Sequence, residues 1–302
     1  MGIRFHVTLL GLAASFLLAL AAFYQQRAAR ETTRQGRGVV SGASALMATL
    51  VRDRVWLTGW LINLAGFGTQ AVALHLGSVA AVQPLLVTQL LFALPMSSLE
   101  RRTWPTPRDW ASAVAICGGL VLLLAVVGVP PLAAAADRGR VVLAVVAALA
   151  MIVVLVPLAA RSGPPVMVVV TAGCAGLCFA LTAVFIKLTA ADLVRHGVGY
   201  TARDWVGYAL AGSTLLGLVL EQTAFANGPL PWAVATKEAV NPIASYALGI
   251  LAFPAVFPTD AGTLAALAGA GALIVLGAIG LAASPSADVW LTRTEDVHAA
   301  RG

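Results

Sequence analysis

The stretch ATKEAVNPIASYALG, from Ala235 to Gly249, places ionisable and polar residues in an otherwise apolar part of the sequence. Lys237 and Glu238 are adjacent, and Asn241 follows one helical turn later. Glu238, Asn241 and Ser245 are spaced i, i+3 and i+7, so a helix carries them as one polar stripe. Carboxylate, amide and hydroxyl groups in one row can bind an ion or a polar solute.

A partner for Lys237 is available across the preceding turn. That turn centres near Gly228, and Glu221 and Lys237 lie about equally far from it. An antiparallel hairpin therefore brings them to similar depth, and we predict an ion pair between them. The adjacent Lys237 and Glu238 point about 100° apart on a helix and suit each other less. Pro242 frees the carbonyl of Glu238 and is expected to kink this helix. The pair either holds two helices together or forms part of a site or gate.

Three glutamines are the other candidate positions. Gln70 and Gln83 flank an earlier turn as Glu221 and Lys237 flank theirs, and Gln89 follows in the same apolar run as Gln83. Their amides either hydrogen-bond between helices or contact a substrate. The candidate substrate-binding residues are therefore Gln70, Gln83, Gln89, Glu221, Lys237, Glu238 and Asn241.

Enzyme motifs are absent from the sequence. It contains no P-loop, no Gly-x-Ser-x-Gly and no His-Glu-x-x-His. Cys117, Cys174 and Cys178 lie in apolar runs without a histidine or acid at metal-binding spacing, which indicates free buried thiols. We therefore expect no catalytic residue, no cofactor and no metal site, and a protein that is not an enzyme.

The elements that must position the candidate residues are membrane-spanning helices. Of the 302 residues, 60% are hydrophobic and only 11% are charged, whereas soluble domains carry roughly 25% charged residues. Continuous apolar runs of about twenty residues favour helices over a barrel. Segment 39–50 is read as an amphipathic cytoplasmic helix, or alternatively as a thin tenth span. The nine predicted spans are roughly 7–24, 55–76, 79–98, 109–130, 139–160, 166–188, 204–226, 231–253 and 261–283.

The arginines indicate an orientation. With the N-terminus outside and the C-terminus in the cytoplasm, twelve arginines face inward and five face outward, as the positive-inside rule favours. Arginines dispersed over loops without a binding fold exclude a nucleic-acid partner. The inner set is Arg27, Arg30, Arg34, Arg37, Arg52, Arg54, Arg101, Arg102, Arg108, Arg161, Arg293 and Arg301; the outer set is Arg4, Arg138, Arg140, Arg195 and Arg203.

The chain also repeats itself weakly, in the same order in both halves. Four spans, one connector and four further spans place the second set upside down, which is the inverted repeat of many secondary transporters. The predicted parts are a first membrane repeat at 1–131, a connector span at 132–163, a second repeat at 164–285 and a disordered cytoplasmic tail at 286–302. The matches are Ala19–Phe23 with Ala180–Val184, Ala73–Ser78 with Ala224–Pro229, VQPLL with VNPIA, Leu90–Pro95 with Gly249–Pro254, and Asp109 and Gly118 with Asp260 and Gly269.

The stretch WLTGWLINLAGFGTQAVALHLGSVAAVQPLLVTQLLFALP resembles the drug/metabolite transporter (DMT) superfamily. The likeness rests on the Trp56–Gly59 opening, the ALxxGS exit and the Gln-Pro or Asn-Pro pair in the next helix. The most similar branches are the NIPA-type magnesium transporters and the Ala/Val/Leu-rich, EamA-like membrane proteins of actinobacteria. The resemblance covers all nine spans and implies transport. Two features depart from it: only Glu100 follows the third span where acids are expected, and Lys237 would repel a dication.

We therefore expect an all-α polytopic protein in the plasma membrane of a bacterium that moves or exports a small metabolite by alternating access. One alternative is a permease for Mg²⁺ or another dication, in which Glu221 and Glu238 would supply oxygen ligands. Another is a membrane scaffold without transport. The expected partners are the lipid bilayer and a small-molecule or ion substrate, with a homodimer as a further alternative.

Overall fold

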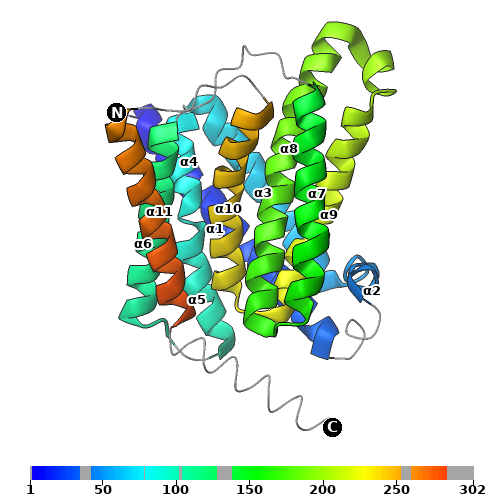
Figure 1. The fold of residues 1–302 in the computed structure, drawn as a ribbon. Helices are drawn as coiled ribbons and strands as arrows, with labels where there is room; N and C mark the ends of the chain where they lie inside the picture. Colours follow the sequence, from blue (N-terminus) through cyan, green and yellow to red (C-terminus); the bar gives the residue numbers. More distant parts are fainter. Residues whose placement is uncertain are drawn as a thin grey trace. The chain divides into compact units, whose positions relative to one another are not determined.

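The structure is a computed structural model that describes residues 2–34, 42–77, 79–101, 104–127, 138–252 and 260–283. Within these ranges every regular element is an α-helix, as predicted, and no strand occurs (Figure 1). The helices are α1 (Gly2–Arg34), α2 (Gly42–Leu50), α3 (Arg54–Leu76), α4 (Val79–Val87), α5 (Gln89–Arg101), α6 (Pro107–Val127), α7 (Arg138–Ala160), α8 (Pro164–Thr201), α9 (Trp205–Asn227), α10 (Leu230–Ala252) and α11 (Ala261–Ala282).

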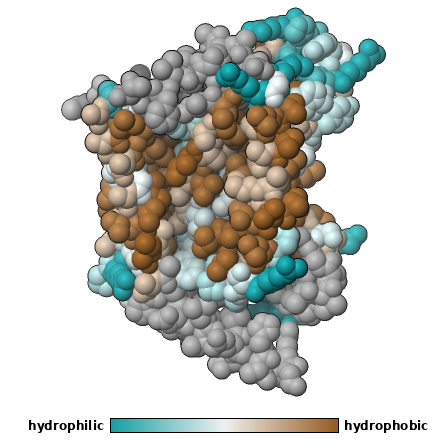
Figure 2. Space-filling view, in the orientation of Figure 1, coloured by the Kyte–Doolittle hydropathy of each residue, from teal (hydrophilic) through white to brown (hydrophobic). Residues whose placement is uncertain are grey.

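Eight helical stretches are long and apolar enough to cross a membrane. Their outward faces carry large exposed apolar side chains, such as Leu143, Val153 and Leu276. Figure 2 shows these hydrophobic faces along the middle of α7, α8 and α11. Faces of this kind suit the hydrocarbon core of a bilayer, and the chain is a multi-pass membrane protein. Helix α10, which contains Lys237, Glu238 and Asn241, is not among the eight.

Within the described ranges each of the nine predicted spans coincides with helix, but three details differ from the prediction. Helix α1 continues beyond the predicted end at residue 24 as far as Arg34. The third span is interrupted at Thr88, where α4 ends and α5 begins. Helix α10 continues through Pro242 as one element, so the proline does not break the helix. Helix α2 has only 9 residues, too few for the roughly 20 that a span needs. The number of crossings stays a prediction.

The chain divides into two compact units. The first comprises Met1–Val129, Phe225–Ala235 and Asp260–Gly302, and the second comprises Pro130–Ala224 and Thr236–Thr259. The α9–α10 hairpin therefore belongs to the second unit except for its tip, which belongs to the first. These two units are defined by their compactness, whereas the predicted parts of the chain are defined by sequence repetition. The predicted division into 1–131, 132–163, 164–285 and 286–302 therefore stays a prediction. The tail 286–302 lies outside the described residues.

In the first unit, α1 packs antiparallel along α3, and glycines make the contact close. A Cβ atom added at Gly59 would lie 3.1 Å from the carbonyl oxygen of Ala21, and one at Gly77 would lie 2.6 Å from a methyl of Val7. In the second unit, an apolar core joins α7, α8, α9 and α10 and includes Ala144, Leu181 and Leu220. Cys174 and Cys178 lie in this core as free buried thiols, as predicted.

Acidic side chains cap the N-terminal ends of three helices of the first unit. The Asp53 carboxylate accepts hydrogen bonds from the backbone N–H groups of Val55 at 2.8 Å and Trp56 at 2.9 Å. The Asp109 carboxylate accepts one from the N–H of Thr106 at 2.7 Å. Asp260 caps α11 by accepting from the N–H of Thr263 at 2.7 Å, and this bond lowers the pKa of the Asp260 carboxyl. Such caps satisfy helix N–H groups that lack an intrahelical partner.

Candidate functional site

The predicted ion pair is present in the second unit. The Lys237 Nζ of α10 lies 2.8 Å from Oε1 of Glu221 on α9 and donates a hydrogen bond to it. The same Nζ lies 3.3 Å from Oε1 of the adjacent Glu238. The three side chains are largely buried, with 12% of Glu221, 16% of Lys237 and 25% of Glu238 exposed. One ammonium thus serves two carboxylates, although the prediction favoured the pair with Glu221 alone.

A close helix contact holds this cluster in place. A Cβ atom added at Gly176 of α8 would lie 2.8 Å from the carbonyl oxygen of Lys237 and 3.2 Å from the backbone nitrogen of Asn241. Only glycine at position 176 allows α8 to approach the α10 backbone this closely. The Ser245 hydroxyl donates to Oδ1 of Asn241 at 3.4 Å, which extends the polar row by one turn.

The helices that carry the cluster also contribute to the apolar core of the second unit. Leu220 precedes Glu221 and is buried in the core of the second unit, as are Ala244 and Leu248 of α10. Charged groups interact strongly and are costly in such an environment unless they are paired. Among the described residues, no group of three or more His, Cys, Asp or Glu side chains is arranged to hold a metal ion. The arrangement can bind or exchange small charged groups, and it can join α9 to α10.

The three candidate glutamines lie in the first unit, and the structure does not join them. Gln70 of α3 and Gln83 of α4 are half-buried, and among the described residues no hydrogen bond links their amides. Gln89 is 5% exposed and is the first residue of α5, directly after the interruption at Thr88. At that interruption the Thr88 and Ser15 hydroxyls lie 2.9 Å apart.

Sequence reasoning missed a polar face on the last turns of α1. Gln26 is 1% exposed, and its Nε2 donates to the carbonyl oxygen of Gly228 at 2.6 Å. Nη2 of Arg30 donates to the same oxygen at 3.3 Å. Gly228 follows the end of α9, where carbonyl groups lack intrahelical donors. Gln26 and Arg30 are spaced i, i+4, and that spacing was the available signal, because it puts both on one helix face.

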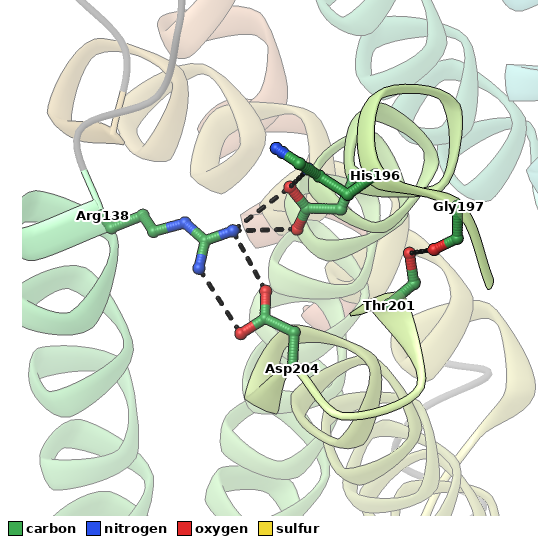
Figure 3. Close-up of polar contacts among 6 residues, drawn as sticks. Arg138, His196, Gly197, Thr201 and Asp204 are labelled. Atoms are coloured by element: carbon green, nitrogen blue, oxygen red, sulfur yellow. Dashed lines mark hydrogen bonds and ion pairs between the residues drawn. The ribbon is translucent and has the colours of Figure 1, made fainter. Parts of the chain in front are cut away.

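A second missed arrangement lies at the other end of α9 (Figure 3). Nη2 of Arg138, on the first turn of α7, lies 3.0 Å from Oδ2 of Asp192 on α8 and 3.0 Å from Oδ2 of Asp204, just before α9. The two carboxylates are nearly buried, at 12% and 9% exposure. Gly197 has φ +76°, a conformation that favours glycine, and it interrupts α8 between them. We refer to Arg138, Asp192 and Asp204 as the three-helix clasp. The residues of the clasp are far apart in the sequence, so no local sequence pattern predicted this arrangement.

The fold and this geometry define a class: a multi-pass helical membrane protein with an ion-paired cluster among apolar helices. No family model matches the sequence, and no solved structure matches it. Among curated proteins, the chain is 27% identical over 251 residues to an uncharacterized protein of Corynebacterium glutamicum. That match covers 80% of this chain and 83% of the relative.

Proposed function

We propose that the protein is a secondary transporter or exporter of a small metabolite that works by alternating access in the bacterial plasma membrane, with its N-terminus outside. The observation that carries the proposal is the cluster of Glu221, Lys237 and Glu238 in the second unit. Ionisable side chains inside membrane helices are costly and in general mark pathways for ions or solutes. The proposed substrate contacts of the second unit are this cluster and Asn241. In the first unit, the amides of Gln70, Gln83 and Gln89 are separate candidate contacts.

Packing between α6 and α11 supports the inverted repeat on which alternating access depends. The alignment of Asp109 with Asp260 makes Gly119 equivalent to Ala270. A Cβ atom at Gly119 would lie 2.8 Å from the carbonyl oxygen of Ala270, so the helices approach closely at equivalent positions. Ser112, earlier in α6, meets Gly277, later in α11, so the pair is antiparallel. A two-fold axis that exchanges antiparallel helices must run perpendicular to them, which for spanning helices lies in the membrane plane.

A second contact recurs in both halves and gives independent support. The alignment of Ala73 with Ala224 makes Gly66 equivalent to Gly217, and the alignment of Ala19 with Ala180 makes Leu18 equivalent to Phe179. A Cβ atom at Gly66 would lie 3.0 Å from the side chain of Leu18, and one at Gly217 would lie 3.0 Å from that of Phe179. The α1–α3 and α8–α9 contacts therefore use matching positions, as two copies of one unit would. The same repeat is what the resemblance to the DMT superfamily implies.

Reconstitution into proteoliposomes tests the proposal. Uptake is measured for a panel of amino compounds, organic acids, sugars and Mg²⁺, with empty liposomes as the blank. We expect saturable uptake of at least one organic solute and none of Mg²⁺, because Lys237 stands between the two carboxylates that a dication would need. Saturable Mg²⁺ uptake alone would establish the divalent-cation permease instead. If the folded protein takes up no solute at all, the remaining hypothesis is a membrane scaffold without transport.

A further inference from the structure

The charges of the cluster do not cancel. With both carboxylates ionised, Glu221 and Glu238 carry two negative charges against the single positive charge of Lys237. One negative charge is left over among apolar helices of the second unit, where an unpaired charge is costly. A bound cation would compensate it.

The geometry assigns the uncompensated negative charge to the Glu238 carboxylate. Glu221 is the more buried carboxylate and accepts the shorter contact from Lys237, at 2.8 Å. Glu238 has a longer contact of 3.3 Å and twice the exposed fraction, 25% against 12%. A carboxylate offers about four lone-pair sites, so Glu238 keeps room for a second donor. Asn241 and Ser245 supply an amide and a hydroxyl on the following turns of the same helix.

The groups around Glu238 favour a monovalent cation over a dication. Mg²⁺ needs a near-octahedral shell of oxygen ligands at about 2.0–2.1 Å. Among the described residues, no such group of acidic ligands exists, and the Lys237 ammonium already contacts both carboxylates. A protonated amine has a single charge and N–H donors, so it can share Glu238 with Lys237 as a second lysine would. We infer that the substrate of this site carries one positive charge on a protonated amine, which Glu238 binds. This inference rests on the proposed transport function.

Binding of small probes to the full-length protein in nanodiscs tests the inference apart from transport. The probes are n-butylammonium, neutral n-butyramide, n-butyrate and Mg²⁺ at constant ionic strength, and the readout is the concentration-dependent rise of the unfolding temperature. We expect butylammonium to stabilise the protein and the other three probes to have no effect. Stabilisation by butyrate, by Mg²⁺ or by no probe would overturn the inference.

A charge series locates the binding group. Glu238→Gln brings the cluster to zero net charge, and Glu221→Gln does the same because Lys237 then takes Glu238 for itself. Both changes should weaken butylammonium binding about tenfold or more, as loss of a charge-assisted hydrogen bond does. Glu238→Asp keeps the charge and should keep the binding, which covers the case in which Glu238→Gln does not fold. The control Asp260→Asn removes a carboxylate in the first unit and should leave binding unchanged.

The outcomes also separate this inference from the proposed function. If proteoliposomes take up a neutral or anionic solute through this site while butylammonium does not bind, the amine assignment is wrong and the transporter stands. If butylammonium binds through Glu238 but no solute crosses the membrane, the transporter proposal fails and the cation site stands. Equal butylammonium binding in the wild type and in Glu238→Gln would overturn the assignment to Glu238.

Discussion

At the scale of single residues, Gly176 sets the distance between α8 and α10. Its missing Cβ would lie 2.8 Å from the Lys237 carbonyl oxygen, a backbone atom that cannot rotate away. Gly176→Ala should therefore push the helices apart and lower the stability by about 1–3 kcal/mol, as overpacking does. Thermal unfolding in detergent measures this.

Gly173 provides the matched control for that change. It lies one turn earlier in α8, and an added Cβ would be 3.7 Å from the side chain of Val240, an ordinary contact. Gly173→Ala should keep the wild-type unfolding temperature or raise it slightly. If both alanine variants unfold alike, the close approach at Gly176 does not determine the packing.

Lys237 should be needed both for stability and for transport. Lys237→Met leaves two largely buried carboxylates without their cation, and removing one partner of such a pair costs about 3–5 kcal/mol. Without the ammonium between them the two carboxylates repel each other, so transport should fail or depend on pH differently from the wild type. Unfolding and uptake measured over a pH series check both effects.

The double variant Glu221→Gln with Lys237→Met separates a gate from a structural contact. It removes the charges of the primary pair together and should recover much of the lost stability. If the pair forms a gate or site, uptake should still fail or keep its altered pH dependence. A double variant that is stable and fully active at every pH would show that the pair only holds α9 to α10.

At the scale of helices, the contact between α6 and α11 depends on particular small residues. Small residues recur every four positions in both helices: Ala111, Ala115 and Gly119 in α6, and Gly262, Ala266 and Ala270 in α11. In the structure, Gly119 and Ala270 do meet, but Ala111 and Gly262 are exposed, and a further close contact joins Ser112 and Gly277. A four-residue spacing shows which positions share a face, but not which face meets the partner.

Two adjacent glycines of α6 test that contact. A Cβ at Gly119 would meet the Ala270 carbonyl oxygen at 2.8 Å, whereas a Cβ at Gly118 would have no heavy atom within 4 Å. Gly119→Ala should lower the unfolding temperature, and Gly118→Ala should not. Equal unfolding of the two variants would contradict the close approach and weaken the argument for a two-fold axis there.

The three-helix clasp should hold the ends of α7, α8 and α9 together. Arg138→Met would leave Asp192 and Asp204 nearly buried without a cation. We expect faster hydrogen–deuterium exchange in residues 189–205, measured by mass spectrometry. Arg195→Met is the control, because it removes an exposed arginine from α8, the helix that carries Asp192. Similar exchange in both variants would show that the clasp contributes no order.

At the scale of the whole molecule, the orientation of the chain in the membrane is still to be tested. Single cysteines at Arg34 and Arg101 should be protected from an impermeant thiol reagent in intact cells, and those at Arg138 and Arg195 should be labelled. The three native cysteines are buried and should contribute little background. Labelling at position 34 without labelling at position 195 would reverse the orientation.

The sequence alone determined the membrane class, the approximate position of each long helix and the ion pair. Hydropathy is a local property, and a run of about twenty apolar residues has few stable alternatives to a helix in lipid. The Glu221–Lys237 pair followed from counting residues to a common turn, because two antiparallel helices rise equally per residue.

The tertiary structure decided which faces of the helices meet. The clasp, the contact of Gln26 with Gly228 and the approach of α8 at Gly176 all depend on how each helix is rotated about its axis. In the membrane this rotation is set by packing with other helices rather than by a strong polar–apolar pattern. The same reason explains why Gln70 and Gln83, which lie on either side of one turn in the sequence, are not joined by a hydrogen bond in the folded chain.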